Sequence, residues 1–213
     1  MIQLIKPLLP LLLITGLFAC QQAEKQPEAL DYIAQANEVI VRDRDSAVLL
    51  MEKAVSLDPN NTKALQSLGS LYLQTSAFTK ALDLYRNLTA LNPQHAEAWQ
   101  IMAMIHSNQD SLDLAKDYYN KAEEAFLNRL KTVQSDQQRY EALASLAMNY
   151  GIMGKPGKMQ ETLAQIDNEQ IRELWIKGAA NFNPDYVKEF FKQLEESNPD
   201  FLKDSASQND STP

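Results

Sequence analysis

The chain has little of the chemistry on which catalytic and metal sites depend. Its 213 residues include one Cys, two His and six Gly. The single cysteine, Cys20, can form no disulfide within the chain, and no His or acidic residue stands beside it to make a reactive thiolate or a metal cluster. No HExxH, CxxC or glycine-rich phosphate loop is present. No catalytic motif stands out, so we expect a non-catalytic protein without a cofactor or metal.

Positive charge is also scarce. The chain has 20 Lys and Arg against 28 Asp and Glu, a formal net charge of −8. Nucleic acids and anionic lipid surfaces are bound through Lys and Arg that neutralise phosphate groups. This balance therefore disfavours nucleic acid and anionic lipid as partners.

The start of the chain differs from the rest. Lys6 is followed by a run without charge over residues 7–19. A membrane-spanning helix needs about 20 apolar residues, so this run is too short to span, but it has the length of the apolar part of a secretory signal. Two prolines, Pro7 and Pro10, also disfavour a folded helix here. We expect residues 1–19 to be a signal peptide.

The end of that run, Leu17-Phe18-Ala19-Cys20, resembles a bacterial lipobox, with Leu three positions before the Cys and a small residue next to it; Phe18 departs from the usual pattern. The resemblance implies that Cys20 is joined to diacylglycerol and becomes the N-terminus of a tether over residues 20–27. Two or more acyl chains anchor a protein stably. Gln21 resembles the residue that favours sorting to the outer membrane, facing the periplasm of the bacterial cell envelope. The alternative is an ordinary cleaved signal with an incidental Cys.

An internal repeat organises the rest of the chain. Two copies are marked by positions 65 and 99, which are 34 residues apart, and an earlier copy over residues 28–61 precedes them. A fourth copy is marked by position 143, which is 44 after 99. The copies share small residues where two helices would meet, large apolar residues three and four apart, and Pro or Asn in the turns. The shared positions are Leu65, Leu68, Gly69, Tyr72, Ala81, Tyr85 and Pro93, then Trp99, Met102, Ala103, His106, Ala115 and Tyr119, with Ala47, Met51 and Pro59 before them and Leu143, Leu146, Ala147 and Tyr150 after them.

This pattern resembles the tetratricopeptide repeat. The resemblance implies an all-α fold, a right-handed superhelical solenoid of antiparallel helix pairs, with about four repeats over residues 28–167. The insertion before the fourth copy predicts that the helix starting near Ser111 extends to about Thr132. Ser135 and Gln138 are then spaced as a capping box for the next helix. We expect His106 to be a packed core side chain.

A pair of capping helices is expected over residues 168–198, because the last repeat of a solenoid has an apolar face to cover. The first would place Ile171, Leu174 and Trp175 on one face, and Asn183-Pro184 would begin the second. The rival interpretation is an amphipathic helix offered to a partner. The polar segment at residues 199–213 predicts a disordered tail.

In proteins of this repeat type the first helix of each pair lines a concave groove, and the resemblance implies which residues face it here. They are Lys63, Gln66, Ser70, Gln74, Gln100, Met104, Asn108, Tyr140 and Met148. We therefore expect a lipid-anchored, non-catalytic envelope scaffold that binds a protein or peptide in this groove. The alternative is a structural envelope lipoprotein that self-associates through Trp175 and the Phe190/Phe191 face as a homo-oligomer.

Overall fold

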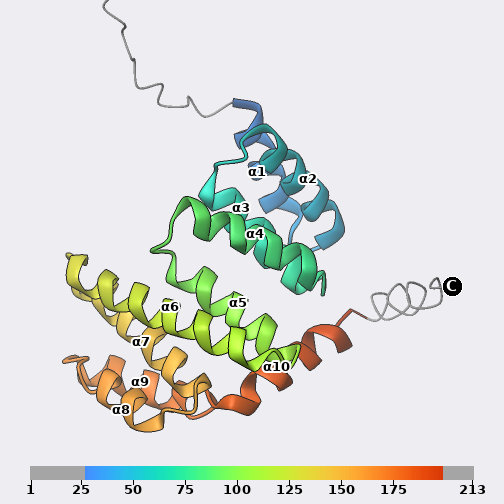
Figure 1. Cartoon of the computed structure of the whole chain (residues 1–213). Helices are drawn as coiled ribbons and strands as arrows, with labels where there is room; N and C mark the ends of the chain where they lie inside the picture. Colours follow the sequence, from blue (N-terminus) through green and yellow to red (C-terminus); the bar gives the residue numbers. More distant parts are fainter. Residues whose placement is uncertain (1–26, 199–213) are drawn as a thin grey trace, which may run out of the picture.

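The computed structural model describes residues 27–198, and these residues form ten α-helices without a strand (Figure 1). The helices are α1 (Pro27–Val39), α2 (Arg44–Leu57), α3 (Thr62–Gln74), α4 (Phe78–Leu91), α5 (Ala96–Asn108), α6 (Leu112–Thr132), α7 (Asp136–Ile152), α8 (Pro156–Leu163), α9 (Glu169–Ala179) and α10 (Pro184–Glu196). The predicted signal peptide, Cys20 and the C-terminal tail lie outside the described residues. Within residues 27–198, no helix is both long enough and apolar enough to span a bilayer.

Consecutive helices pack as antiparallel pairs: α1 with α2, α3 with α4, α5 with α6, and α7 with α8. Each pair also contacts the next one through α2 and α3, α4 and α5, and α6 and α7. Because the large contacts of the array are between neighbours in sequence, it has the organisation of a solenoid. The predicted all-α solenoid of helix pairs is confirmed.

Short-range capping sets where the helices begin. Asn61 and Asn183 accept backbone N–H groups at the starts of α3 and α10, as an N-cap side chain does. The turns inside three successive pairs each contain one residue in the left-handed region: Ser76 (φ 59°), Asp110 (φ 55°) and Gly154 (φ 68°). These three turns therefore have the same backbone reversal at equivalent places of the repeat.

The insertion lengthens α6, as predicted. This helix runs from Leu112 to Thr132, and its far end buries Phe126 in a cluster with α5 and α7. Ser135 then caps α7: its hydroxyl accepts the N–H of Gln138 at 3.3 Å, while the Gln138 side chain accepts the N–H of Gln134 at 3.4 Å. The extra residues are thus packed into the array as additional turns of helix.

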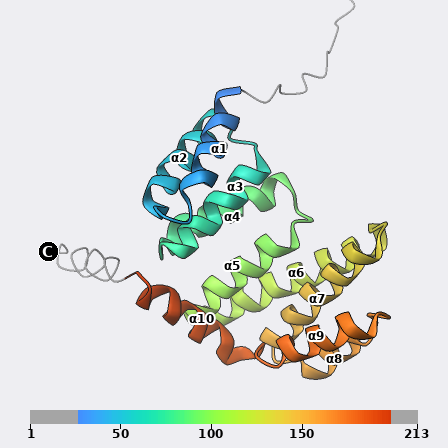
Figure 2. The same ribbon diagram turned by 180° about the vertical axis from the view of Figure 1, so that it is seen from behind.

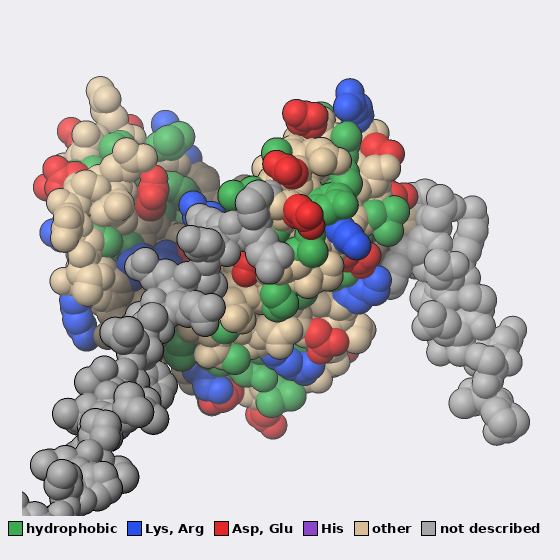
Figure 3. All heavy atoms as spheres, turned by 90° about the horizontal axis from the view of Figure 1, so that it is seen from above, with side chains coloured by type: hydrophobic (Ala, Val, Ile, Leu, Met, Phe, Trp, Pro, Cys, Tyr) green, Lys and Arg blue, Asp and Glu red, His purple; other side chains and the backbone are tan. Residues whose placement is uncertain are grey.

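The last two helices do not form a matched pair. Helix α9 contacts α7 and α8, whereas α10 contacts α5 and α7, earlier in the chain. Both ribbon views show α10 turning back along the ends of the preceding helices (Figure 2). A third view shows the surface hollowed between two lobes, with acidic, basic and apolar side chains interspersed (Figure 3).

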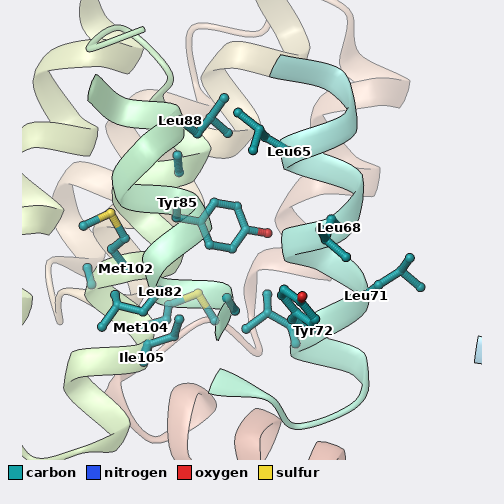
Figure 4. Close-up of a cluster of buried hydrophobic side chains, with 14 of the residues drawn as sticks. Leu65, Leu68, Leu71, Tyr72, Leu82, Tyr85, Leu88, Met102, Met104 and Ile105 are labelled. Atoms are coloured by element: carbon teal, nitrogen blue, oxygen red, sulfur yellow. The ribbon is translucent and has the colours of Figure 1, made fainter. Parts of the chain in front are cut away.

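The centre of the core lies where α3 meets α4. Tyr85, on α4, is only 1% exposed, and its hydroxyl is directed at α3 between Leu65 and Leu68 (Figure 4). Its ring fits there because Gly69 has no side chain: a Cβ at that position would be 2.9 Å from Cζ of Tyr85. Gly69 is therefore required for the close approach of the two helices.

Candidate protein-binding surface

Helix α3 carries the open part of the predicted groove. Lys63, Gln66 and Ser70 are exposed, and Gln74 is half-buried. Gln66 is also linked to the next repeat, because its side-chain oxygen lies 3.3 Å from Nε2 of His95. Since Nδ1 of His95 accepts the N–H of Ala98 at 3.3 Å, the proton of the neutral ring is on Nε2 and is donated to Gln66.

Two side chains on α5 contradict part of the groove prediction. Gln100 is 3% exposed and Met104 is 8% exposed, so the expectation that both face a ligand is wrong. Gln100 donates to Oδ1 of Asn149 at 3.4 Å, and Asn149 donates to the backbone oxygen of Tyr119 at 3.2 Å. These contacts join α5, α6 and α7, and Gln100 therefore serves the packing of the array.

The remaining predicted positions are only partly accessible. Asn108 is half-buried at the end of α5, and Met148 is half-buried against the central core. Tyr140, at the start of α7, donates its hydroxyl to Asp167 in the turn before α9 and packs with the apolar cluster of α7, α8 and α9. The structure thus brings together Lys63, Gln66 and Ser70 on one helix, but it directs Tyr140 to a different part of the array.

An ion pair that the groove prediction did not include joins α5 and α6. The two terminal guanidinium nitrogens of Arg129 donate to the two carboxylate oxygens of Glu97, one of them at 2.6 Å. Burial alone would raise the pKa of Glu97, but hydrogen bonds from Arg129 and its charge outweigh burial and lower that pKa. Glu97 is 34 positions after Lys63, so the repeat period could have found it; Arg129 lies in the insertion and carries no such signal.

Two hollows flank this ion pair, and both are lined by Arg129 and Thr132. One, of about 520 Å³, extends between α6 and the turn before α5; the other, of about 460 Å³, extends towards α7. Polar side chains contribute to both: Asn92, Gln94, Asn128 and Lys131 to the first, and Glu97, Gln138, Glu141 and Ser145 to the second. Within the described ranges, no three His, Cys, Asp or Glu side chains could together hold a metal ion.

His106 lies in the core, as predicted. It is 6% exposed and its ring is 5.4 Å from that of Tyr118. Neither ring nitrogen has a hydrogen-bond partner among residues 27–198, and burial lowers the pKa of the ring. The imidazole is therefore a neutral packing element.

The C-terminal aromatic face is only partly available. Phe191 is 1% exposed and packs edge-on against Phe78, with ring centroids 4.9 Å apart. The expectation that Phe191 forms a face for self-association is therefore wrong, because the side chain is already buried within the chain. Phe190 is half-buried, and on α9 Leu174, Trp175 and Ile176 are exposed by 68%, 36% and 51%.

Comparison with known proteins identifies the repeats. Two family models, both described as tetratricopeptide repeat, match residues 41–105 and 96–128. Among curated proteins, protein bimA of Emericella nidulans is 28% identical over 81 residues, and BBSome complex member BBS4 of Bos taurus is 31% identical over 77 residues. These matches cover 38% and 36% of this chain but only 10% and 15% of those relatives.

Two solved structures of MamA are also similar. One is 21% identical, with a TM-score of 0.43, covering 79% of this chain and 96% of MamA; the other is 20% identical, with a TM-score of 0.46, covering 83% and 94%. The assignment of the repeats depends on the family models and on the helix pairs seen in the fold. Residues 41–128 of this chain therefore match the tetratricopeptide repeat in sequence, and the same residues form its paired helices in the structure.

Proposed function

We propose that this protein is a non-catalytic scaffold that binds a protein or peptide on the exposed face of α3. The observation that supports this most is the row formed by Lys63, Gln66 and Ser70. Residues three and four apart share one face of a helix, and all three of these side chains are exposed. The same helix buries Ala64, Leu65 and Leu68, so it is held in place from behind. A fixed helix with a polar row is suited to recognising an extended chain.

The chemistry of the row favours a peptide ligand over a small molecule. An ammonium, an amide and a hydroxyl group can bond to backbone carbonyl and N–H groups without demanding one side-chain sequence. The neighbouring Glu97–Arg129 pair adds both charges at the next helix. Specificity would then come from the ligand side chains that fit the hollows around Arg129.

We further propose that the scaffold is lipid-anchored through Cys20 in a bacterial cell envelope, at the outer membrane and facing the periplasm. The support is the lipobox-like Leu17-Phe18-Ala19-Cys20 and the short uncharged run before it. Growth of the native host with an alkyne-labelled palmitate tests the anchor. Label should appear on the wild-type protein and be absent from a Cys20→Ala variant. Equal labelling of both proteins would exclude Cys20 as the acylated residue.

Affinity capture from the native host tests the binding face. A variant carrying Gln66→Glu and Ser70→Glu changes the exposed row, whereas Asn87→Glu with Ala90→Glu places the same charges on exposed positions of α4. We expect one partner to be retained with wild type and the α4 control and lost with the α3 variant. Retention of the same proteins by all three would contradict the assignment of this face.

A second candidate function is self-association through α9. It is favoured by three large apolar side chains of α9, Leu174, Trp175 and Ile176, which are exposed around the helix. Sedimentation velocity over a range of protein concentrations tests it, with Leu174→Asp and Ile176→Asp together as the disrupting variant. A wild-type protein that stays monomeric at every concentration would contradict this function.

A further inference from the structure

Helix α10 crosses the turns of three successive helix pairs. Pro184 lies against Gly154, where a Cβ would be 3.4 Å from Cγ of the proline. Farther along, Nζ of Lys188 is 3.8 Å from a carboxylate oxygen of Asp110. At the other end, the Ser76 hydroxyl donates to the backbone oxygen of Leu194 at 3.3 Å.

The three turn residues that α10 meets are those with left-handed backbone: Gly154, Asp110 and Ser76. They occupy the same place in their repeats, so the turns form a regular edge. The order of contacts along α10 follows the order of the turns in reverse. The single helix α10 therefore contacts the equivalent turns of three repeats, whereas the usual contacts of a solenoid are between neighbouring repeats.

The apolar contacts define what this edge accepts. Val187 and Phe191, four residues apart, are each 1% exposed and are the two buried side chains of α10. They belong to the same buried cluster as Met104 and Ile152, from α5 and α7. The edge thus fits an amphipathic helix that presents an aliphatic and an aromatic residue one turn apart, with a cation opposite Asp110.

Tyr186 and Phe190 of α10 are half-buried against the same cluster, and the opposite face of the helix is open to solvent. Lys188, Glu189, Lys192 and Gln193 are exposed, and Lys192 pairs only with Glu196 of its own helix, at 3.9 Å. Helix α10 follows α9 through residues 180–183, and Asn183 caps its first turn. Detaching α10 would expose Val187 and Phe191 together with the half-buried Tyr186 and Phe190, while the contacts between successive helix pairs would remain.

We propose that this turn edge, formed by residues 74–78, 107–111 and 151–155, is a helix-binding site, and that α10 occupies it as a built-in competitor. Its external ligand is an amphipathic helix with the chemistry of α10. Such a ligand binds when α10 releases the edge. The site is distinct from the exposed row on α3, so this proposal does not depend on the function proposed above.

A peptide with the sequence of residues 183–198, carrying a fluorescent label, tests the site by anisotropy with the full-length protein. In a Phe191→Ala protein the competing helix is weakened, so a larger fraction of the edge is free and the apparent Kd of the peptide falls in proportion. We expect binding at least about tenfold tighter to this variant than to wild type. Hydrogen exchange should show peptide-dependent protection at residues 74–78 and 107–111.

Two matched controls separate docking from a general loosening. An Asn183→Ala protein keeps every side chain at the edge but loses the cap of α10, and should bind the peptide several-fold tighter than wild type. On the peptide, Phe191→Ala should abolish binding, whereas Lys192→Ala, at an exposed position, should largely preserve it.

Two outcomes would overturn the proposal. If both protein variants kept their helical circular dichroism and neither bound the peptide, α10 would be a permanent part of the fold. If wild type and both variants bound equally, the peptide would be bound elsewhere. The Gln66→Glu, Ser70→Glu variant should bind the peptide as its parent does, since it alters the other face.

Discussion

Replacing Gly69 by alanine tests the contact on which the central helix pair depends. The new Cβ would lie 2.9, 3.1 and 3.2 Å from three ring carbons of Tyr85, which is 1% exposed and has little room to move. Overpacking of a core costs about 1–3 kcal/mol. Alanine is favoured over glycine within a helix by about 1 kcal/mol, which offsets part of that cost.

Gly178 provides the matched control. It also lies within a helix, α9, but nothing is within 4 Å of a Cβ placed there. Gly178→Ala should therefore stabilise the protein by about 0.5–1 kcal/mol, through helix preference alone. The overpacking cost sets the difference between the two variants, so Gly69→Ala should be less stable than Gly178→Ala by about 1–3 kcal/mol.

Thermal and urea unfolding followed by circular dichroism measure this difference. For a domain of this size, about 1 kcal/mol changes Tm by roughly 2–4 °C. Gly69→Leu should lower Tm further, because it forces a whole side chain into the space of the Tyr85 ring. Equal stability of Gly69→Ala and Gly178→Ala would refute the reasoning, and with it the register of the repeat.

Three further predictions concern buried and paired groups. His106→Phe should raise Tm by a few degrees in a melting scan, because it removes two buried ring nitrogens that have no partner within the described chain, each costing about 1–3 kcal/mol; an unchanged or lower Tm would contradict this. Burial lowers the pKa of both His95 and His106, so the unfolded chain binds more protons than the folded one as pH falls through the ordinary histidine range. Tm should therefore fall between pH 7.5 and pH 5.5, and it should fall less steeply in His106→Phe. A Tm that does not change with pH would exclude this linkage. Glu97→Gln should lower stability by about 1 kcal/mol after allowance for solvent screening of this half-exposed pair with Arg129, and urea melts should show a smaller loss in high salt.

The parts of the fold that the sequence predicts are those set by short-range signals. The repeat period places the central helix pairs, and the spacing of Ser111, Thr132 and Ser135 predicts the long α6 and the start of α7. Asn183-Pro184 likewise predicts the start of α10. Each of these signals acts within a few residues along the chain, through helix period, capping or the fixed φ of proline.

The parts that were wrong depend on contacts between distant residues. Gln100 is buried because Asn149, 49 positions later, covers and bonds to it. Phe191 is buried because α10 returns to Phe78, at the start of α4. Neither contact follows from a local pattern, since the same amide or aromatic residue at the same helix position would be exposed in a repeat without these additions.

The two departures from a regular array lie at opposite ends of the helices. The lengthened α6 helps to form the hollows around Arg129 at one end, and α10 covers the turn edge at the other. Between them, Gln100 and Met104 are closed off from solvent, while Lys63, Gln66 and Ser70 on α3 stay open. A ligand of the groove would therefore meet α3 first, and release of α10 would change the turn edge without altering that row. Two separable binding surfaces on one small solenoid would let it hold two partners at once.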